Sequence, residues 1–236
     1  MARLADLRVG AVLVAPAHPY PIGTVLSSAR RVALVEWAQR NDGLVIEDDY
    51  DAEFRYDRAP IGALQGLAPD RVAYAGCASK TLTPALRLGW IMLPRWLVDD
   101  VVREKLFDDM GNTLIEQVAL ARFIDTGIPT KHLRRVRPIY RRRRDATLEA
   151  LAASLPGASA TGIAAGLHVY VQLPSGCDES GLTETARRGS ADRRSPLALV
   201  ESALAPALVL GYGSIDESKI RTGLQLLGSI YQRSAQ

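Results

Sequence analysis

The sequence has few of the residues that build disulfide frameworks and metal centres. Its 236 residues include only two cysteines and three histidines. The two cysteines, Cys77 and Cys177, fit neither a disulfide framework nor the short ligand spacing of a zinc site. So low a cysteine content is typical of a chain that folds in a reducing compartment. The sequence therefore predicts a fold without disulfides and no metal site.

Long apolar runs are also missing. A membrane-spanning helix needs about 20 consecutive, mostly apolar residues, and no stretch of this chain reaches that length. The opening residues MARLADLRVG lack the apolar core of a secretory signal peptide. We therefore expect a cytoplasmic protein with no membrane partner.

The chain is nevertheless rich enough in apolar residues to bury a sizeable core. Hydrophobic residues make up 47% of the sequence and charged residues 23%, which is typical of a globular protein. The net charge of +3 is too small to indicate nucleic-acid binding by itself.

Short apolar runs alternate with a helical pattern in the first part of the chain. Residues 27–42, SSARRVALVEWAQRND, carry apolar residues at spacings of three and four, with Ser27 or Ser28 available to cap a helix. Four short runs favour strands: GAVLVAP, GLVIEDDY, RVAYAGCA and RLGWIMLP. The order strand, helix, strand favours a parallel or mixed α/β sheet with functional side chains at the strand ends.

The remaining chain is predicted to form helices followed by a small α+β unit. A helical stretch runs from about residue 95 to 155, with one break near TGIPT. Five segments then predict strand, helix, two short strands and a closing helix: GLHVYVQLP, CDESGLTETARRG, SPLALV, ALVLGYG and DESKIRTGLQLLGSIYQ. We place the domain boundary within the helical stretch, giving domains at 1–125 and 126–236.

The acidic stretch VIEDDYDAEFRY has several possible interpretations. Side chains alternate across a strand, so Asp48 and Tyr50 are predicted to share one face. The other acids take the opposite face if the strand persists: Glu47, Asp49 and Asp51. Taken alone, such acids are usually solvated or paired, here with Arg55 and Arg58. A divalent-metal site is a second possibility, which no distant ligand cluster supports.

Three segments in order suggest a known family. APAHPYPIG, EDDYD and CASKTLTPALRLG resemble the second half of the pyridoxal-phosphate-binding large domain of fold-type I, class I/II aminotransferases. More narrowly, EDDYDAEFRY, PIGALQGL and SKTLTPALRLGW are similar to the aminotransferase-like domain of MocR/GabR-type regulators of the GntR family. The resemblance covers essentially the whole chain. It implies a fold-type I PLP-dependent transferase architecture, α/β, with a partial large domain built on a mixed sheet and a small C-terminal α+β domain.

The resemblance gives roles to individual residues. Lys80 would be the catalytic lysine, whose primary amine binds the aldehyde of pyridoxal 5'-phosphate (PLP) and moves the substrate Cα proton. Asp48 would hold the pyridine nitrogen protonated, and Tyr50 would hydrogen-bond the ring oxygen. Arg87 and Ser79 would bind the phosphate. Each of these five side chains is therefore expected at one cofactor site.

Other positions depart from the wider family. Tyr20 precedes PIG where metabolic aminotransferases carry an asparagine, and an aromatic residue there is similar to the regulator branch. Cys77 stands where a phosphate-contacting serine or threonine is expected. The run ALVLGYG lacks the arginine that grips a substrate carboxylate, and Arg221 on the next helix is expected to face solvent. Tyr20 favours the regulator branch, the Cys77 thiol is expected to weaken phosphate binding, and the missing arginine argues against amino-acid transamination.

Further N-terminal segments of the family have no counterpart in this sequence. Family members carry a glycine-rich phosphate loop and a stacking aromatic residue before the region that this chain resembles. The regulators also carry a winged helix-turn-helix. We therefore expect an N-terminally truncated chain that would reach DNA only through an absent winged-helix domain.

The basic run KHLRRVRPIYRRRRDATLEAL permits two interpretations. An arginine-rich helix can neutralise nucleic-acid phosphates. Alternatively, it is the solvated face of an arm between the domains, and the spacing of Leu133, Val136 and Tyr140 favours this second interpretation because it marks a buried stripe. Pro138 is predicted to interrupt and kink the helix.

Two functional hypotheses follow. In the first, this is the PLP-binding, amino-compound-sensing domain of a MocR/GabR-type transcriptional regulator, where ligand exchange at Lys80 changes domain closure. In the second, it is a stand-alone class I/II aminotransferase acting on an amino acid or amine. The motif details favour the first hypothesis. The resemblance also implies a homodimer.

Overall fold

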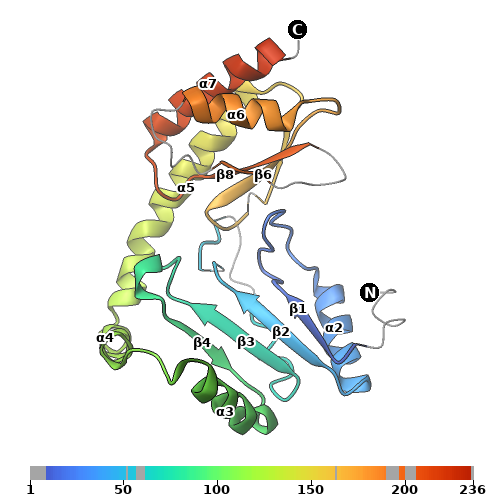
Figure 1. The fold of residues 1–236 in the computed structure, drawn as a ribbon, viewed down its shortest axis with the longest axis vertical. Coiled ribbons are helices and arrows are strands. Elements are labelled where there is room, and N and C mark those ends of the chain that lie inside the picture. The colour runs from blue at the N-terminus through green and yellow to red at the C-terminus, as the bar shows by residue number, and fades with distance from the viewer. Residues whose placement is uncertain are drawn as a thin grey trace. The chain divides into compact units, whose positions relative to one another are not determined.

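The chain separates into two compact units. The computed structural model describes residues 9–51, 53–56, 62–162, 164–189, 197–199 and 206–234. The first unit contains residues 1–19, 25–53 and 59–133, and the second contains 20–24, 54–58 and 134–236. Figure 1 draws both units, and each is described here by itself.

The first unit is built on a four-stranded mixed sheet in the order β1-β2-β3-β4. Its strands are β1 (Ala11–Val14), β2 (Leu44–Asp49), β3 (Val72–Cys77) and β4 (Gly89–Met92). The first three strands are parallel and β4 runs antiparallel to β3. The predicted α/β class with a mixed sheet is therefore confirmed, and each strand falls within an apolar run identified in the sequence.

Helix α2 (Ser28–Arg40) packs against this sheet. Its N-cap is Ser27, whose hydroxyl accepts a hydrogen bond from the Arg30 N–H at 3.4 Å. Buried residues of the helix, the sheet and the segment before β3 form one apolar cluster: Leu34, Val35, Trp37, Ala38, Val45, Leu64, Ala68 and Val72. This cluster fixes β2, the strand that carries the acidic stretch.

The helical region contains one more break than the sequence predicted. Two 3-10 helices, η1 (Pro84–Leu86) and η2 (Arg95–Leu97), precede α3 (Val98–Asp109), α4 (Leu114–Asp125) and α5 (Ile128–Ser154). The expected break near TGIPT is present, but a second break follows α3. There Met110 and Gly111 adopt left-handed backbone angles, with φ of 53° and 100°, and end α3. The predicted interruption at Pro138 was wrong, because α5 continues through it as one helix.

The second unit is an antiparallel sheet in the order β5-β6-β8-β7 with helices packed on it. Its strands are β5 (Ser159–Thr161), β6 (His168–Gln172), β7 (Leu197–Leu199) and β8 (Ala207–Gly211), and its own helices are α6 (Glu179–Gly189) and α7 (Glu217–Ser234). One core joins the end of α5, α6 and α7 to β6 and β8. The short strand β5, with the sequence SAT, was not predicted because it has no apolar run.

Two arginines near the end of the basic run make contacts within the second unit. Arg143 donates to the Gly213 carbonyl at 2.5 Å. The buried Arg144 pairs with Asp145 at 2.7 Å and lies over the Tyr56 ring. Arg134, Arg135 and Arg141 are exposed, as the interpretation of a solvated helix face predicts.

Among the described residues, no helix is both long and apolar enough to cross a membrane.

Candidate functional site

The strand ends of the first unit bring the predicted site residues to one edge of the sheet. The carboxyl ends of parallel strands meet at the same edge, and antiparallel β4 begins there because Gly89 pairs with Cys77. In Figure 1 this is the edge at the arrowheads of β1, β2 and β3. Five predicted residues lie on or beside these strand ends: Asp48, Tyr50, Ser79, Lys80 and Arg87.

Asp48 is a half-buried carboxyl on the penultimate position of β2. It faces away from Glu47 and Asp49, as strand alternation predicts. Burial raises the pKa of Asp48, and the negative charges of Asp49 and Asp51 raise it further. Within the described part of the chain, no hydrogen bond or ion pair reaches its oxygens, so no described cation neutralises this carboxylate.

Glu47, the preceding residue, is only 2% exposed and has a different role. Its two carboxylate oxygens accept the Leu64 N–H at 2.9 Å and the Gln65 N–H at 3.1 Å. Burial raises the pKa of Glu47, although these two N–H groups and the Arg31 charge oppose the shift. Glu47 thus holds the segment before β3 against β2.

Two strand-end loops are tied together by residues that follow β1 and β2. The Asp51 carboxylate accepts a hydrogen bond from His18 Nδ1 at 2.9 Å, and both side chains are almost completely buried. The Tyr50 hydroxyl donates to the His18 carbonyl at 2.7 Å. Of the arginines expected to pair with these acids, Arg58 lies outside the described residues. The partner of Asp51 is instead His18, which the sequence did not suggest.

The position of Tyr50 bears on its predicted role. Its single proton is already donated to the His18 carbonyl. Donation to a cofactor ring oxygen would require the hydroxyl to turn away from that carbonyl, because a phenol has one O–H. The neighbouring phenol, Tyr74, donates to Asp49 at 2.8 Å, and burial together with this carboxylate raises the pKa of Tyr74.

The lysine sits in a tight turn directly after β3. The Leu82 N–H donates to the Ala78 carbonyl at 2.9 Å and closes the turn around Ser79 and Lys80. Lys80 is exposed, and among the described residues its ammonium group has no hydrogen bond or ion pair. A hydrogen bond that the sequence analysis missed supports the turn: His132 Nε2 lies 2.9 Å from the Thr81 carbonyl oxygen. His132 is far along the chain, so only the structure could reveal it.

Arg87 closes the same loop in an unusual backbone conformation. It follows η1 with φ 50° and ψ 32°, in the left-handed region that non-glycine residues rarely adopt. Such conformations cost about 1–3 kcal/mol and cluster at functional sites. The side chain is exposed. Cys77, at the end of β3, is a half-buried free thiol whose backbone pairs with Gly89.

Tyr20 belongs to the second unit. It is 56% exposed, and its ring packs edge-on against His168 at 5.2 Å between centroids. The peptide bond from Tyr20 to Pro21 is cis. The Pro21 carbonyl lies 3.2 Å from His168 Nε2, and the Ile22 carbonyl accepts from Thr161 at 3.3 Å. These contacts place the turn at residues 20–24 on the sheet of the second unit.

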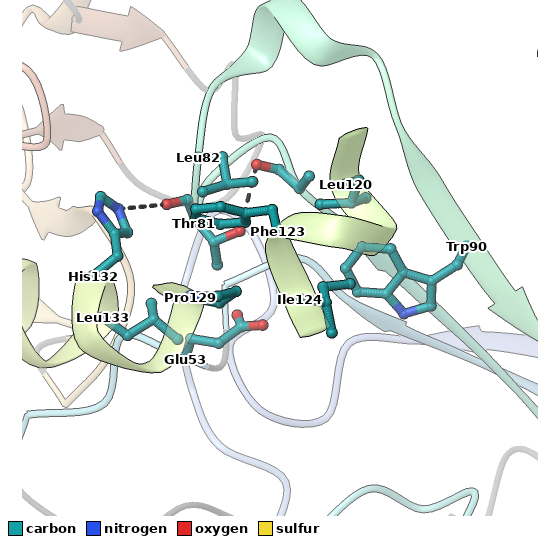
Figure 2. Close-up of a pocket in the computed structure, with 11 residues that line it drawn as sticks. Glu53, Thr81, Leu82, Trp90, Leu120, Phe123, Ile124, Pro129, His132 and Leu133 are labelled. Carbon is teal, nitrogen blue, oxygen red and sulfur yellow. Dashed lines mark hydrogen bonds between the residues drawn. The ribbon is translucent and has the colours of Figure 1, made fainter. Parts of the chain in front are cut away.

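An apolar pocket of about 130 Å³ lies beneath the lysine turn. Figure 2 shows that Thr81 and Leu82 line it from the turn and Trp90 from β4, while Phe123 and Leu133 come from α4 and α5. Most of the described lining residues are apolar, and Glu53 adds a carboxylate to the lining. The turn that carries Lys80 therefore rests on the packing of α4 and the start of α5.

The chain is similar to bacterial regulators and to solved aminotransferases. No family model matches it. It is 36% identical over 219 residues to the uncharacterized HTH-type transcriptional regulator YhdI of Bacillus subtilis, covering 90% of this chain and 46% of YhdI. It is 31% identical over 224 residues to the probable rhizopine catabolism regulatory protein MocR of Rhizobium meliloti, covering 93% of this chain and 45% of MocR.

A solved structure extends the likeness to the whole fold. The kynurenine aminotransferase of Pyrococcus horikoshii superposes with a TM-score of 0.90 at 29% identity, covering 100% of this chain and 60% of that one. The chain therefore has the fold of a fold-type I aminotransferase-like domain. The similarity to YhdI and MocR confirms the resemblance to MocR-type regulators, and the chain spans about half the length of the curated relatives it matches.

Proposed function

We propose that this chain is the PLP-binding, amino-compound-sensing domain of a MocR/GabR-type transcriptional regulator. The observation that carries the proposal is the presence, at one edge of the sheet, of an exposed Lys80 and a half-buried Asp48 that no described residue neutralises. The names of the relatives support the regulatory role. The kynurenine aminotransferase of Pyrococcus horikoshii was solved in complex with PMP, which supports the cofactor.

The residues of the first unit fit such a cofactor. The raised pKa of Asp48 reflects burial and nearby negative charge, so a protonated ring nitrogen would supply the missing cation. Lys80 offers an ammonium group that is not engaged by another described residue. Arg87 and Ser79 lie on the two ends of the loop from β3 to β4, where their donors suit a phosphate. Tyr20 and Tyr50 remain proposed ring contacts.

Each of these residues has a separate task. When bound, PLP supplies an electron sink for the ligand's Cα carbon. Asp48 holds a proton at the ring nitrogen, and Arg87 and Ser79 anchor the phosphate. Lys80 would provide the primary amine that holds the cofactor's aldehyde reversibly and that an amino-compound ligand would displace. Once displaced, the Lys80 amine can hold or return a proton near the ligand's Cα.

In the regulator, this displacement is the sensing event. A ligand can shift a conformational equilibrium only as far as it binds the two states differently. We propose that amino-compound exchange at Lys80 alters closure between the two domains, 1–125 and 126–236, and so changes the state of a winged-helix DNA-binding domain elsewhere in the full protein. The sensor would act in the cytoplasm, where its DNA partner lies.

A homodimer is part of the proposal. Neither α3 nor α4 contains a buried residue among those described, yet both expose large apolar side chains. The most exposed of these are Ile115, Phe107, Leu114 and Val102. Apolar surface of this kind marks a contact with another chain or segment, which supports assembly with a second copy within the longer protein.

A stand-alone aminotransferase is the second candidate, favoured by the likeness to the solved enzyme. One feature of the second unit opposes it. Strand β8, ALVLG, carries no arginine for a substrate carboxylate. Arg221, on α7, is at the surface and pairs with Glu149 at 2.9 Å, as a solvent-facing position predicts. A carboxylate-binding role for Arg221 would require this pair to break.

The deciding experiment is a PLP titration of the purified chain followed by visible absorbance. We expect a band that shifts when an amine is added and that is lost in Lys80→Ala, because the Lys80 amine is the group proposed to hold the aldehyde at this edge. Lys131→Ala is the matched control, since Lys131 is also exposed. A band that survives in Lys80→Ala would contradict the assignment. Turnover of an amino acid with a keto acid would favour the enzyme over the sensor.

A further inference from the structure

His132 forms a hydrogen bond to the residue that follows the proposed cofactor lysine. Its Nε2 lies 2.9 Å from the Thr81 carbonyl oxygen, as the dashed line in Figure 2 shows. A carbonyl oxygen can only accept, so Nε2 must carry the proton. The ring is half-buried at the rim of the apolar pocket. A directed donor from α5 therefore holds the lysine turn.

The other described hydrogen bonds of the turn are local. On the sheet side, the Ala78 N–H donates to the Leu88 carbonyl at 3.0 Å, and the Leu82 N–H closes onto Ala78. The Thr81 hydroxyl also returns to the Ala78 carbonyl at 3.4 Å. All of these bonds lie within the loop between β3 and β4. The bond from His132 differs from them because it ties the turn to a helix distant in sequence.

We infer that His132 is a positioning residue for Lys80, which holds the lysine turn on the first turns of α5. The spectroscopic part of this inference rests on the proposed function. Helix α5 continues from His132 in the first unit to Arg143 in the second, where it bonds the Gly213 carbonyl. The same helix thus contributes His132, which bonds the lysine turn, and Arg143, which bonds the second unit.

The first test measures PLP affinity and visible absorbance in two substitutions of one side chain. His132→Ala removes the donor, and we expect about fivefold weaker PLP binding and an altered visible band, because one hydrogen bond that orients Lys80 is lost. His132→Gln places an amide N–H near the position of Nε2 and is expected to restore most of the affinity and the wild-type band. Lys131→Ala is expected to change neither.

The result that would overturn the inference is a His132→Ala protein with wild-type affinity and spectrum. An equal loss of PLP affinity in His132→Ala and His132→Gln would also overturn it. The hydrogen-bond donor at this position would then not be what supports PLP binding. Circular dichroism and thermal melting check that each variant is folded.

A second measurement does not depend on the cofactor. Hydrogen–deuterium exchange of the cofactor-free chain reports the amides of residues 78–82. We expect faster exchange of these amides in His132→Ala than in the wild type or His132→Gln. Unchanged exchange would overturn the inference. If the wild type binds no PLP but exchange responds as expected, the proposed function fails while the positioning role of His132 stands.

Discussion

The buried pair between His18 and Asp51 is predicted to be a main source of stability at the functional edge. Asp51 Oδ2 and His18 Nδ1 lie 2.9 Å apart, with side-chain exposures of 3% and 0%. Asp51→Ala would leave the His18 N–H without this acceptor in a site that water barely reaches. The loss of a buried hydrogen bond to a charged group costs about 1.5–3 kcal/mol. We therefore expect the free energy of unfolding to fall by about 2 kcal/mol.

Urea denaturation followed by circular dichroism measures this difference. For a chain of this length, about 2 kcal/mol corresponds to a fall in Tm of roughly 4–8 °C. Asp51→Asn keeps a carbonyl acceptor and is expected to lose less than Asp51→Ala. Asp70→Asn is the matched control because the Asp70 side chain is exposed. If Asp51→Ala stays within about 0.5 kcal/mol of the wild type, the range of an ordinary surface substitution, the pair does not stabilise this edge.

Two further predictions concern buried groups in the two units. Because the pKa of Glu47 is raised in the folded state above 4.5, the folded chain binds the proton more tightly than the unfolded chain. The wild type should therefore lose stability relative to Glu47→Gln as pH rises from about 4.5 through the raised pKa. Parallel pH slopes of the two unfolding free energies would contradict this. In α7, a Cβ at Gly228 would lie 2.5 Å from the Ser154 carbonyl oxygen, whereas one at Gly223 meets nothing within 4 Å. Gly228→Ala should destabilise by about 1–3 kcal/mol through overpacking, and Gly223→Ala should stabilise by up to about 1 kcal/mol through helix propensity. Thermal melts of the two variants measure this difference. Equal changes in Tm for Gly228→Ala and Gly223→Ala would contradict the close packing of α7 on the end of α5.

The sequence predicted the elements of the fold well where hydrophobic patterns were long or strongly periodic. The four strands of the first sheet and helix α2 each coincide with an apolar run or an amphipathic pattern. The break after α3 was missed although Gly111 and Asn112 are common turn residues, because an apolar pattern resumes directly after them in LIEQVALARF. Strand β5 was missed because a three-residue strand gains its pairing from β6 and not from its own composition.

The candidate site was predictable only in part, for a related reason. Strand order and parallel pairing allow the sequence to bring Asp48 and Lys80 to one edge. The contacts that hold them are long-range bonds between side chains and the backbone, such as those of His18 with Tyr50 and of His132 with Thr81. His18 lies in the segment APAHPYPIG, but that pattern does not indicate its partners, and His132 lies in no recognisable motif. Single-sequence patterns give no information on such pairs, because their spacing in the chain is set by the topology.

The acidic end of β2 illustrates how one strand separates structural from functional carboxylates. Glu47 and Asp48 are neighbours, and burial raises the pKa of both. Alternation turns Glu47 to the face where the Leu64 and Gln65 N–H groups satisfy it. Asp48 is turned to the other face, where no described group donates a hydrogen bond to its carboxylate. A one-residue shift in the pairing of β2 with β3 would exchange these environments. The register between Asp48 and Ala75 therefore determines which of the two acids can meet a ligand.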